Sequence, residues 1–474
     1  MTPDRQLWRR GAAAVLGSGA AYFLVRGATP VWAMAWVAPA PVLAFACAAP
    51  ARAAAVAAFV AYALGGLASL PLLAAVVSVP VLVVVLVGTS VAFAALVLVT
   101  RRVTIRRNRW DAVFVFPILW TACDHLASRG GVAGIAYSQV DCPPAIQIAA
   151  WTGMAGVTFL VSLAPSALAL AWHLRRNRGE AVRAFAIPLA LCAAALGWGA
   201  WRLAQPEIGA MVRVGLAATD ETIRFFRTER ADEALPVVAA YVRRIDALAA
   251  RGAQVVVLPE KFVGVTPAYA DAARDLLAVA ARTHHVWVVA GLNRIAGSAP
   301  RNVALVLDPD GQVAMEYAKV HMVPGYEDGY VTGQAPATIR TAAGTWAVAI
   351  CRDLMFTDVA RANARAGAGL LLVPAWDFGA DGRLAARIAA MRAVEDGVAV
   401  ARPAQDGVVA VSDDRGRILA EAATNGTPEA LLVVDVPMGR GATLYSRVGD
   451  WFGWIATLAA VILIVWRPAV TSGD

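Results

Sequence analysis

Three polar residues follow apolar segments of this chain, and their side chains together have the chemistry of an acyl-transfer site. Glu260 ends the apolar run 255–259, Cys351 ends the run 346–350, and Lys319 follows a predicted hairpin. A thiolate is a strong nucleophile, a partly desolvated carboxylate can act as a general base, and an ammonium group stabilises thiolates and oxyanions. The order Glu, Lys, Cys along the chain therefore predicts nucleophilic catalysis.

Lysine is so rare in this sequence that each one is a candidate for a specific role. The chain contains 42 Lys and Arg residues, of which only Lys261 and Lys319 are lysines. Arg is planar and always charged, whereas the Lys ammonium is a compact donor whose pKa responds to burial. We expect Lys319 to do work that Arg cannot do. Lys261, directly after Glu260, has no role that the sequence assigns.

The same residues also have ordinary structural interpretations. A Cys after an apolar strand is often a small buried side chain, and His321 is an alternative base for Cys351 that lacks an orienting partner in the sequence. Arg352 either forms a local ion pair with Asp353 or meets a phosphate group. The chain has no phosphate-binding glycine loop, and His284-His285 is more typical of a helix end than of a metal site. We therefore expect neither a cofactor nor a metal.

Much of the remaining chain is apolar enough to cross a membrane. Hydrophobic residues make up 59% and charged residues 16%, with a mean hydropathy of +0.60. A helix needs about 20 apolar residues to span the hydrocarbon core. We predict a membrane domain over residues 1–207 with about seven transmembrane helices, a globular domain over 208–440, and a last transmembrane helix and tail over 441–474. The predicted spans are 11–26, 30–50, 53–77, 79–100, 111–128, 151–173, 184–203 and 451–467, and 129–150 is predicted to be a loop on or in the membrane.

The arginines predict the orientation of these spans. With the N-terminus inside, the cytoplasmic loops contain most of the loop arginines, at 5–10, 52, 101–109 and 175–183, whereas the opposite short loops contain only Arg26 and Arg129. This asymmetry follows the positive-inside rule and places residues 208–440 outside and both termini, with Arg467, in the cytoplasm. Because much of the net charge of +8 lies in these loops, it indicates no nucleic-acid partner.

Residues 208–440 alternate short β-rich runs with amphipathic helices, which predicts a layered α/β domain with sheets inside and helices outside. Two Asp- and Gly-containing segments, 308–311 and 413–416, are typical of hairpin turns. Strands are predicted at 211–217, 254–258, 286–290, 303–307, 346–351 and 370–374, and helices at 234–250, 270–283, 357–366 and 383–394.

Residues 208–440 resemble the nitrilase (carbon–nitrogen hydrolase) superfamily, and the whole chain resembles its membrane-embedded branch, the apolipoprotein N-acyltransferase family. The likeness rests on the triad order, on segments 134–139 and 153–160 in the membrane half, on 392–397, and on 443–451. The resemblance implies an αββα sandwich in which Glu260 is the base, Lys319 the oxyanion stabiliser and Cys351 the nucleophile. It also implies that Glu327 corresponds to the second glutamate of the family.

The chain departs from the family pattern around the expected pocket, in segments 324–328, 351–353 and 374–379. These departures leave the preferred phospholipid and acceptor open. Phe262, Trp376 and Phe378 are expected to line a substrate entrance, with core packing as the alternative.

The resemblance implies a two-step reaction in a bacterial inner membrane, with the catalytic domain on the periplasmic side. A phospholipid acyl chain forms a thioester on Cys351 and then passes to the N-terminal amine of a diacylglyceryl-cysteine lipoprotein. Two alternatives remain open at this point. The enzyme is a membrane-anchored amidase or ester hydrolase, or the chain is a membrane scaffold with an inactive nitrilase-like domain.

Overall fold

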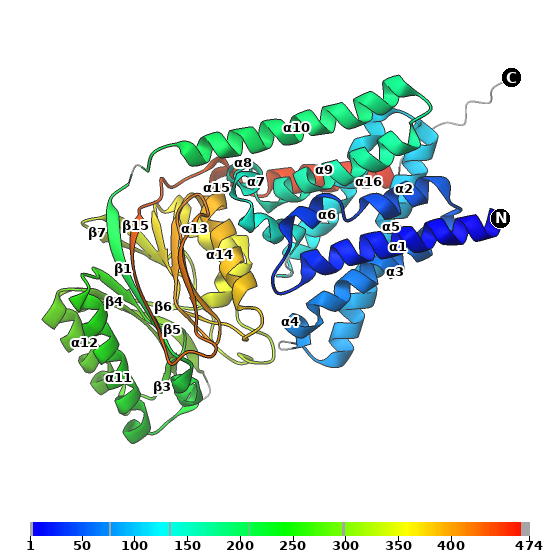
Figure 1. The fold of residues 1–474 in the computed structure, drawn as a ribbon. Coiled ribbons are helices and arrows are strands. Elements are labelled where there is room, and N and C mark those ends of the chain that lie inside the picture. The colour runs from blue at the N-terminus through cyan, green and yellow to red at the C-terminus, as the bar shows by residue number, and fades with distance from the viewer. Residues whose placement is uncertain (1–2, 75–76, 132–133, 208, 296–298, 466–474) are drawn as a thin grey trace. The chain divides into compact units, whose positions relative to one another are not determined.

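The chain forms two compact units in a computed structural model that describes residues 3–74, 77–131, 134–207, 209–295 and 299–465 (Figure 1). One unit contains residues up to Arg202 together with those from Asp450 onward, and the other contains Leu203–Gly449.

Within the described residues, the regular secondary structure of the first unit is entirely helical. These segments are apolar over most of their length. A helix satisfies its own backbone hydrogen bonds, which a lipid environment requires. Its longer helices are α1 (Pro3–Arg26), α2 (Ala40–Ala48), α3 (Ala51–Gly66), α5 (Val79–Arg107), α6 (Val115–Ser128), α9 (Met154–His173), α10 (Arg178–Ala204) and α16 (Trp451–Val465). Shorter helices are η1 (Trp32–Trp36), η2 (Leu67–Ser69), α4 (Leu70–Ala74), η3 (Trp110–Phe114), η4 (Ile135–Asp141), α7 (Pro143–Ile146) and α8 (Ala149–Thr152).

Within the described residues, each predicted span overlaps one or more of these helices. Among the described residues, four helical segments are both long and apolar enough to cross a membrane, namely Ala51–Ala74, Val79–Arg107, Met154–His173 and Arg178–Ala204. Trp32–Ala48 and Trp451–Val465 are shorter apolar helical segments. Arg467 and the predicted cytoplasmic tail lie outside the described residues.

The segment predicted as a membrane loop, 129–150, contains the short helices η4 and α7 and the start of α8, and much of it is buried inside the helical unit. Gln139 is fully buried there and accepts a hydrogen bond from the indole N–H of Trp36 at 2.8 Å. The segment therefore packs as part of this unit.

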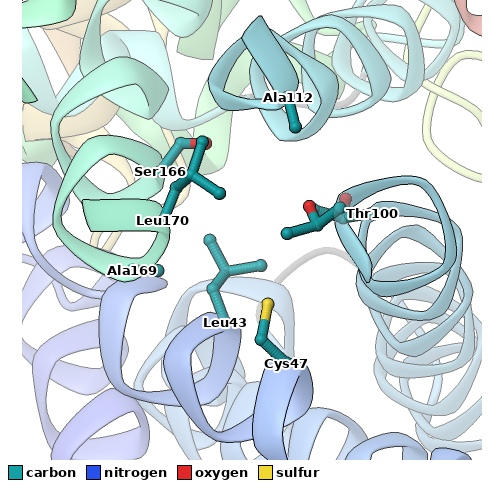
Figure 2. Close-up of a pocket in the computed structure, with 8 residues that line it drawn as sticks. Leu43, Cys47, Thr100, Ala112, Ser166, Ala169 and Leu170 are labelled. Carbon is teal, nitrogen blue, oxygen red and sulfur yellow. The ribbon is translucent and has the colours of Figure 1, made fainter. Parts of the chain in front are cut away.

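A small pocket lies among the helices of the first unit (Figure 2). Leu43, Cys47, Thr100 and Ser166 are among its lining residues, and its volume is about 10 Å³. Such a space holds about one water molecule. It is therefore too small to bind an acyl chain.

The second unit contains two sheets with helices on their outer faces. In the described residues, one sheet has seven strands in the order β15-β1-β2-β4-β5-β6, with β3 beside β4, and the other has six in the order β14-β13-β11-β9-β8-β7. The first sheet comprises β1 (Met211–Ala218), β2 (Val255–Val257), β3 (Val263–Val265), β4 (Trp287–Arg294), β5 (Arg301–Leu307), β6 (Val313–Ala318) and β15 (Ala430–Pro437). The second comprises β7 (Thr338–Thr341), β8 (Gly344–Val348), β9 (Leu370–Leu372), β11 (Ala399–Arg402), β13 (Val408–Ser412) and β14 (Ile418–Ala423).

Helices α11 (Ala231–Ala250) and α12 (Ala270–His284) pack on the first sheet, and α13 (Thr357–Arg365) and α14 (Gly382–Asp396) pack on the second. A third apolar layer joins the inner faces of the two sheets. This is the predicted αββα sandwich. The remaining elements are η5 (Asp220–Arg227), η6 (Cys351–Met355), the strand pair β10 (Ala375–Trp376) and β12 (Ala404–Gln405), and α15 (Leu444–Val448).

The central strands β2 and β9 were predictable because both of their faces are buried, whereas the equally buried central strand β11 was not predicted. All three residues of β2 and of β9 are inaccessible to solvent, so these strands are continuous apolar runs instead of alternating ones. The edge strand β6 was not predicted, because half of its residues are exposed and its pattern is mixed. Both predicted turns are hairpins: 308–311 joins β5 to β6, and 413–416 joins β13 to β14.

Candidate active site

Glu260 is placed by the parallel strand β2, which ends three residues before it. Its backbone N–H donates to the Ala375 carbonyl at 3.2 Å, and the Gln405 side chain donates to its carbonyl at 2.8 Å. Strand β4 passes so close that a Cβ on Gly291 would lie 2.7 Å from the Glu260 Cα. The backbone of Glu260 is thus fixed from three directions, and its side chain is only 2% exposed.

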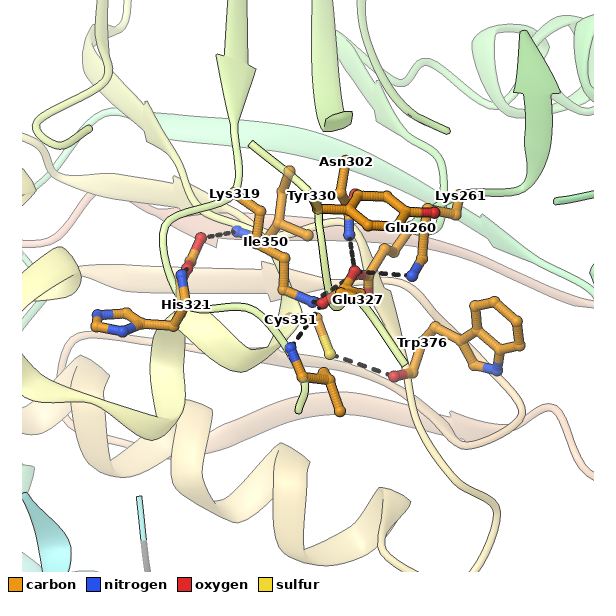
Figure 3. Close-up of polar contacts among 12 residues, drawn as sticks. Glu260, Lys261, Asn302, Lys319, His321, Glu327, Tyr330, Ile350, Cys351 and Trp376 are labelled. Carbon is orange, nitrogen blue, oxygen red and sulfur yellow. Dashed lines mark hydrogen bonds and ion pairs between the residues drawn. The ribbon is translucent and has the colours of Figure 1, made fainter. Parts of the chain in front are cut away.

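Lys319 directly follows β6, and its ammonium lies between two buried carboxylates. Nζ donates to Glu260 Oε1 and to Glu327 Oε2, each at 2.8 Å (Figure 3). Lys319 and Glu327 are each 1% exposed. The structure therefore brings together three of the residues that the sequence proposed, Glu260, Lys319 and Glu327.

Asn302 and Lys261 complete this group, and the sequence had given neither of them a role. The Asn302 amide donates to Glu260 Oε1 and to Glu327 Oε1, so one side chain bridges the two carboxylates. Lys261 Nζ donates to Glu327 Oε1 at 2.7 Å. Asn302 lies in β5 next to the strand that leads to Lys319, and this pairing is a long-range feature that local patterns do not reveal.

Cys351 begins the short helix η6 at the end of the β8 segment. Its φ of +42° is in the left-handed region, which costs a residue with a side chain about 1–3 kcal/mol. Its N–H donates to the Pro374 carbonyl at 3.0 Å and its thiol to the Trp376 carbonyl at 3.2 Å. In Figure 3 the sulfur lies beside the Lys319–Glu327 pair. The thiol is therefore held next to the charged group by a strained backbone.

Asp353 joins the turn after Cys351 to the segment after Lys319. Its Oδ1 accepts from the backbone N–H groups of Val320 and His321, and its Oδ2 accepts from Tyr317 Oη and the Ile350 N–H. With four donors, Asp353 is fully occupied in positioning both catalytic segments.

Arg352 forms no ion pair with Asp353. Its guanidinium lies 5.4 Å above the Phe356 ring, and its buried Nε has no hydrogen-bond partner among the described residues. Of the two alternatives that the sequence left for Arg352, the local ion pair is wrong.

The contacts of the His321 ring do not favour the alternative in which it is the base for Cys351. Its Nε2 bonds to Asp358 at 2.9 Å, and its ring stacks on Phe356 with 4.0 Å between centroids. Burial of Asp358 acts to raise its pKa, but the hydrogen bond and charge of His321 lower it. His321 thus connects the Lys319 loop to α13.

The three residues expected at the substrate entrance have different positions. The prediction for Phe262 was wrong: it is fully buried and packs 4.3 Å from the Tyr241 ring, because the left-handed turn at Lys261 directs the following strand β3 into the core. Trp376 and Phe378 are partly exposed. Trp376 meets the ring of Phe226, and Phe378 lies 5.0 Å from the ring of Tyr326.

A buried ion pair that the sequence did not suggest holds the segment between Trp376 and Phe378. Asp377 accepts two hydrogen bonds from Arg402 of β11. Burial raises the pKa of Asp377 to about 6, with Arg402 acting against this shift. Because the Trp376 carbonyl accepts from the Cys351 thiol, the pair stabilises a loop that contacts the thiol.

The charges of the group act on one another in opposite directions. Burial and the charge of Glu260 raise the pKa of the Cys351 thiol, and Lys319 and Arg402 offset this only in part. Burial opposes ionisation of Glu327, but Lys319 and Lys261 lower its pKa to about 2. Burial likewise opposes charge on Lys319, but Glu260, Cys351 and Glu327 raise its pKa. The thiol is thus neutral at rest and needs a base, whereas Glu327 and Lys319 stay charged.

Comparisons with known proteins relate both parts of the chain to known families. The carbon–nitrogen hydrolase family model matches residues 213–444, and that of the apolipoprotein N-acyltransferase N-terminal domain matches residues 18–168. An apolipoprotein N-acyltransferase of Geobacter metallireducens is 28% identical over 388 residues, which is 73% of each chain. Another, from Gloeobacter violaceus, is 31% identical over 68% of this chain and 65% of its own. Among solved structures, an amidase from Nesterenkonia sp. aligns at 23% identity with a TM-score of 0.40, over 49% of this chain and 93% of the amidase.

Proposed function

This chain belongs to the apolipoprotein N-acyltransferase family within the carbon–nitrogen hydrolases, and we propose that it moves an acyl chain from a phospholipid to a lipoprotein. The acceptor is the N-terminal amine of a diacylglyceryl-cysteine. The observation that carries the proposal is the combination of a family-matched helical half with a buried Glu260–Lys319–Glu327 group beside Cys351. A soluble amidase has no need of the first part, and an inactive scaffold has no need of the second.

The first step makes a thioester. Glu260 takes the proton of the neutral Cys351 thiol, and the thiolate attacks the ester carbonyl of the phospholipid. An ammonium has three N–H groups, and two of those of Lys319 are held by carboxylates, so the third is left for the oxyanion. The backbone N–H of Arg352, at the first turn of η6, is the second oxyanion donor. Collapse expels the lysophospholipid alkoxide, which takes the proton from Glu260.

The second step transfers the acyl group to nitrogen. The lipoprotein amine attacks the thioester carbonyl, and Glu260 accepts the proton that the amine loses. The Cys351 thiolate leaves and recovers this proton, which regenerates the resting thiol. No cofactor or nucleic acid takes part in either step.

Intact-mass analysis of the full-length protein in detergent tests this function. With phospholipid alone, we expect one added acyl mass on the protein. After addition of a diacylglyceryl lipopeptide, we expect loss of that mass and gain of an amide-linked acyl chain on the peptide. Release of free fatty acid with no acylated peptide would instead support the hydrolase alternative.

Arg352 is proposed to bind the phosphate of the acyl donor. It directly follows the nucleophile, it is partly buried, and Asp353 does not neutralise it. Hydrogen bonds to charged groups contribute about 1.5–3 kcal/mol, which corresponds to roughly a tenfold or larger change in affinity.

We therefore expect Arg352→Gln to raise KM for phospholipid about tenfold or more while kcat changes little. Arg352→Lys, which keeps the charge, should recover part of this loss. The measurement is the rate of thioester formation against phospholipid concentration, with a neutral acyl ester that lacks phosphate as the control substrate. An equal loss on the neutral ester would show that Arg352 acts only through the fold.

The proposed topology follows from the arginine distribution. Both termini lie in the cytoplasm of a bacterial cell and the nitrilase-like domain lies on the periplasmic side of the inner membrane. External protease acting on spheroplasts should then cut within residues 208–440. A domain that stays intact under these conditions would indicate the opposite orientation.

A further inference from the structure

We propose that Lys261 is a positioning residue that makes Glu260, and not Glu327, the carboxylate that accepts the Cys351 proton. This inference rests on the proposed roles of Glu260 and Cys351. It assigns a function to the second of the two lysines of the chain.

The contacts of the two carboxylates differ in Lys261 and in one backbone donor. Both accept from the Lys319 ammonium and from the Asn302 amide. Only Glu327 receives the second ammonium, at 2.7 Å, and it also accepts from the Val323 N–H at 2.8 Å. Glu327 therefore has two positive neighbours and Glu260 one. A proton arriving from the thiol is held less favourably by the carboxylate that has more positive charge around it.

The position of Lys261 is strongly determined. Its ammonium lies 5.8, 5.5 and 5.5 Å from the ring centroids of Phe226, Tyr330 and Trp376, within the range of cation–π attraction. Its backbone adopts φ +47°, a conformation that is costly for a residue with a side chain. The side chain is 7% exposed, so the charge acts on Glu327 with little screening by solvent.

The charge count of the site also requires Lys261. Two buried carboxylates and two buried ammonium groups are neutral together, whereas Lys319 alone would leave one carboxylate uncompensated. An uncompensated buried carboxylate takes up a proton. Without Lys261, Glu327 would therefore compete with Glu260 for a proton, and Glu260 would no longer be the favoured acceptor. The other charged groups near this site are Asp353, Arg352, Arg402 and Asp377, and substitutions of Lys261 and Glu327 leave all four in place.

Alkylation of Cys351 by iodoacetamide tests the inference without any acyl donor. The full-length protein is treated from pH 5 to 9, and the rate at Cys351 is followed by peptide mass mapping, which separates it from the other cysteines. In Lys261→Met, loss of a nearby positive charge should move the pH below which Cys351 loses reactivity upward by about 1–3 units. Lys261→Arg retains the charge and should lie close to the wild type.

A compensating variant separates this effect from a structural one. Glu327→Gln combined with Lys261→Met again leaves one carboxylate and one ammonium, so its pH profile should return toward that of the wild type. A Lys261→Met profile that coincides with the wild type, or a double variant as shifted as the single one, would overturn the inference. Because alkylation needs no lipid, a failed acyl transfer with a shifted profile would contradict the proposed function and leave the role of Lys261 standing.

Discussion

Replacement of Cys351 by alanine should abolish both the acyl adduct on the protein and the transfer of that acyl chain to a lipopeptide. Loss of a catalytic nucleophile reduces kcat by on the order of 10⁶-fold, which is below detection in a mass assay. The measurement is intact mass after incubation with phospholipid. The fold should survive, since the side chain makes one hydrogen bond, to the Trp376 carbonyl.

Two variants control this experiment. Cys142→Ala removes another partly exposed free thiol and should leave the adduct unchanged. Cys351→Ser keeps a nucleophilic atom in place but forms an ester instead of a thioester. We expect an acyl adduct on this variant to persist after addition of the lipopeptide. An undiminished adduct in Cys351→Ala would show that the acyl group is attached elsewhere.

The sequence was sufficient to predict the residues that end buried strands. Glu260 and Cys351 follow runs that are apolar because both faces of their sheets are covered, and such runs stand out in the chain. The helices on the outer faces were predictable because their apolar residues recur with helical period, as in α11. The turn at 308–311 placed Lys319 after a hairpin for the same local reasons.

The features that the sequence did not predict depend on contacts between distant segments. Asn302 is a polar residue in a strand, and its importance appears only when β5 pairs with β6 and faces the segment that carries Glu327. Phe262 was misplaced because the turn at Lys261 has a positive φ that no sequence pattern of Lys predicts. The Asp377–Arg402 pair joins residues 25 positions apart, and its two ends give no separate signal.

The role of Lys319 leads to a second prediction with a large effect, for the substitution of Lys by Arg. Lys319→Arg keeps the positive charge, so the buried carboxylates of Glu260 and Glu327 stay neutralised. Removing the charge would instead leave buried partners unpaired, at a cost of about 3–5 kcal/mol, and activity loss would then be confounded with unfolding. The Arg variant should fold with a moderate loss of stability, since an overpacked core typically costs about 1–3 kcal/mol.

Catalysis should nevertheless fall sharply in Lys319→Arg. The ammonium is a point donor at 2.8 Å from each of two carboxylate oxygens, and its remaining N–H is free for the oxyanion. Lys319 is 1% exposed, so a larger side chain has little room there. A planar guanidinium binds carboxylates side by side and cannot donate to Glu260, to Glu327 and to the oxyanion from the position of the ammonium. Loss of one oxyanion donor reduces kcat by roughly 10²–10³-fold, and we expect at least this effect on thioester formation.

The matched control for this prediction is Lys261→Arg, made at the other lysine of the same cluster. Lys261 donates to a single carboxylate oxygen and leaves Glu260 untouched, so Arg there preserves the charge without disturbing the oxyanion donor. Thioester formation is measured for both variants, together with thermal unfolding. A large loss at Lys319 with near-normal rates at Lys261 would show that the position of the donor, and not merely its charge, is what this site requires. Equal rates in the two Arg variants and the wild type would mean that position 319 needs only a positive charge. The oxyanion would then be stabilised by backbone N–H groups alone.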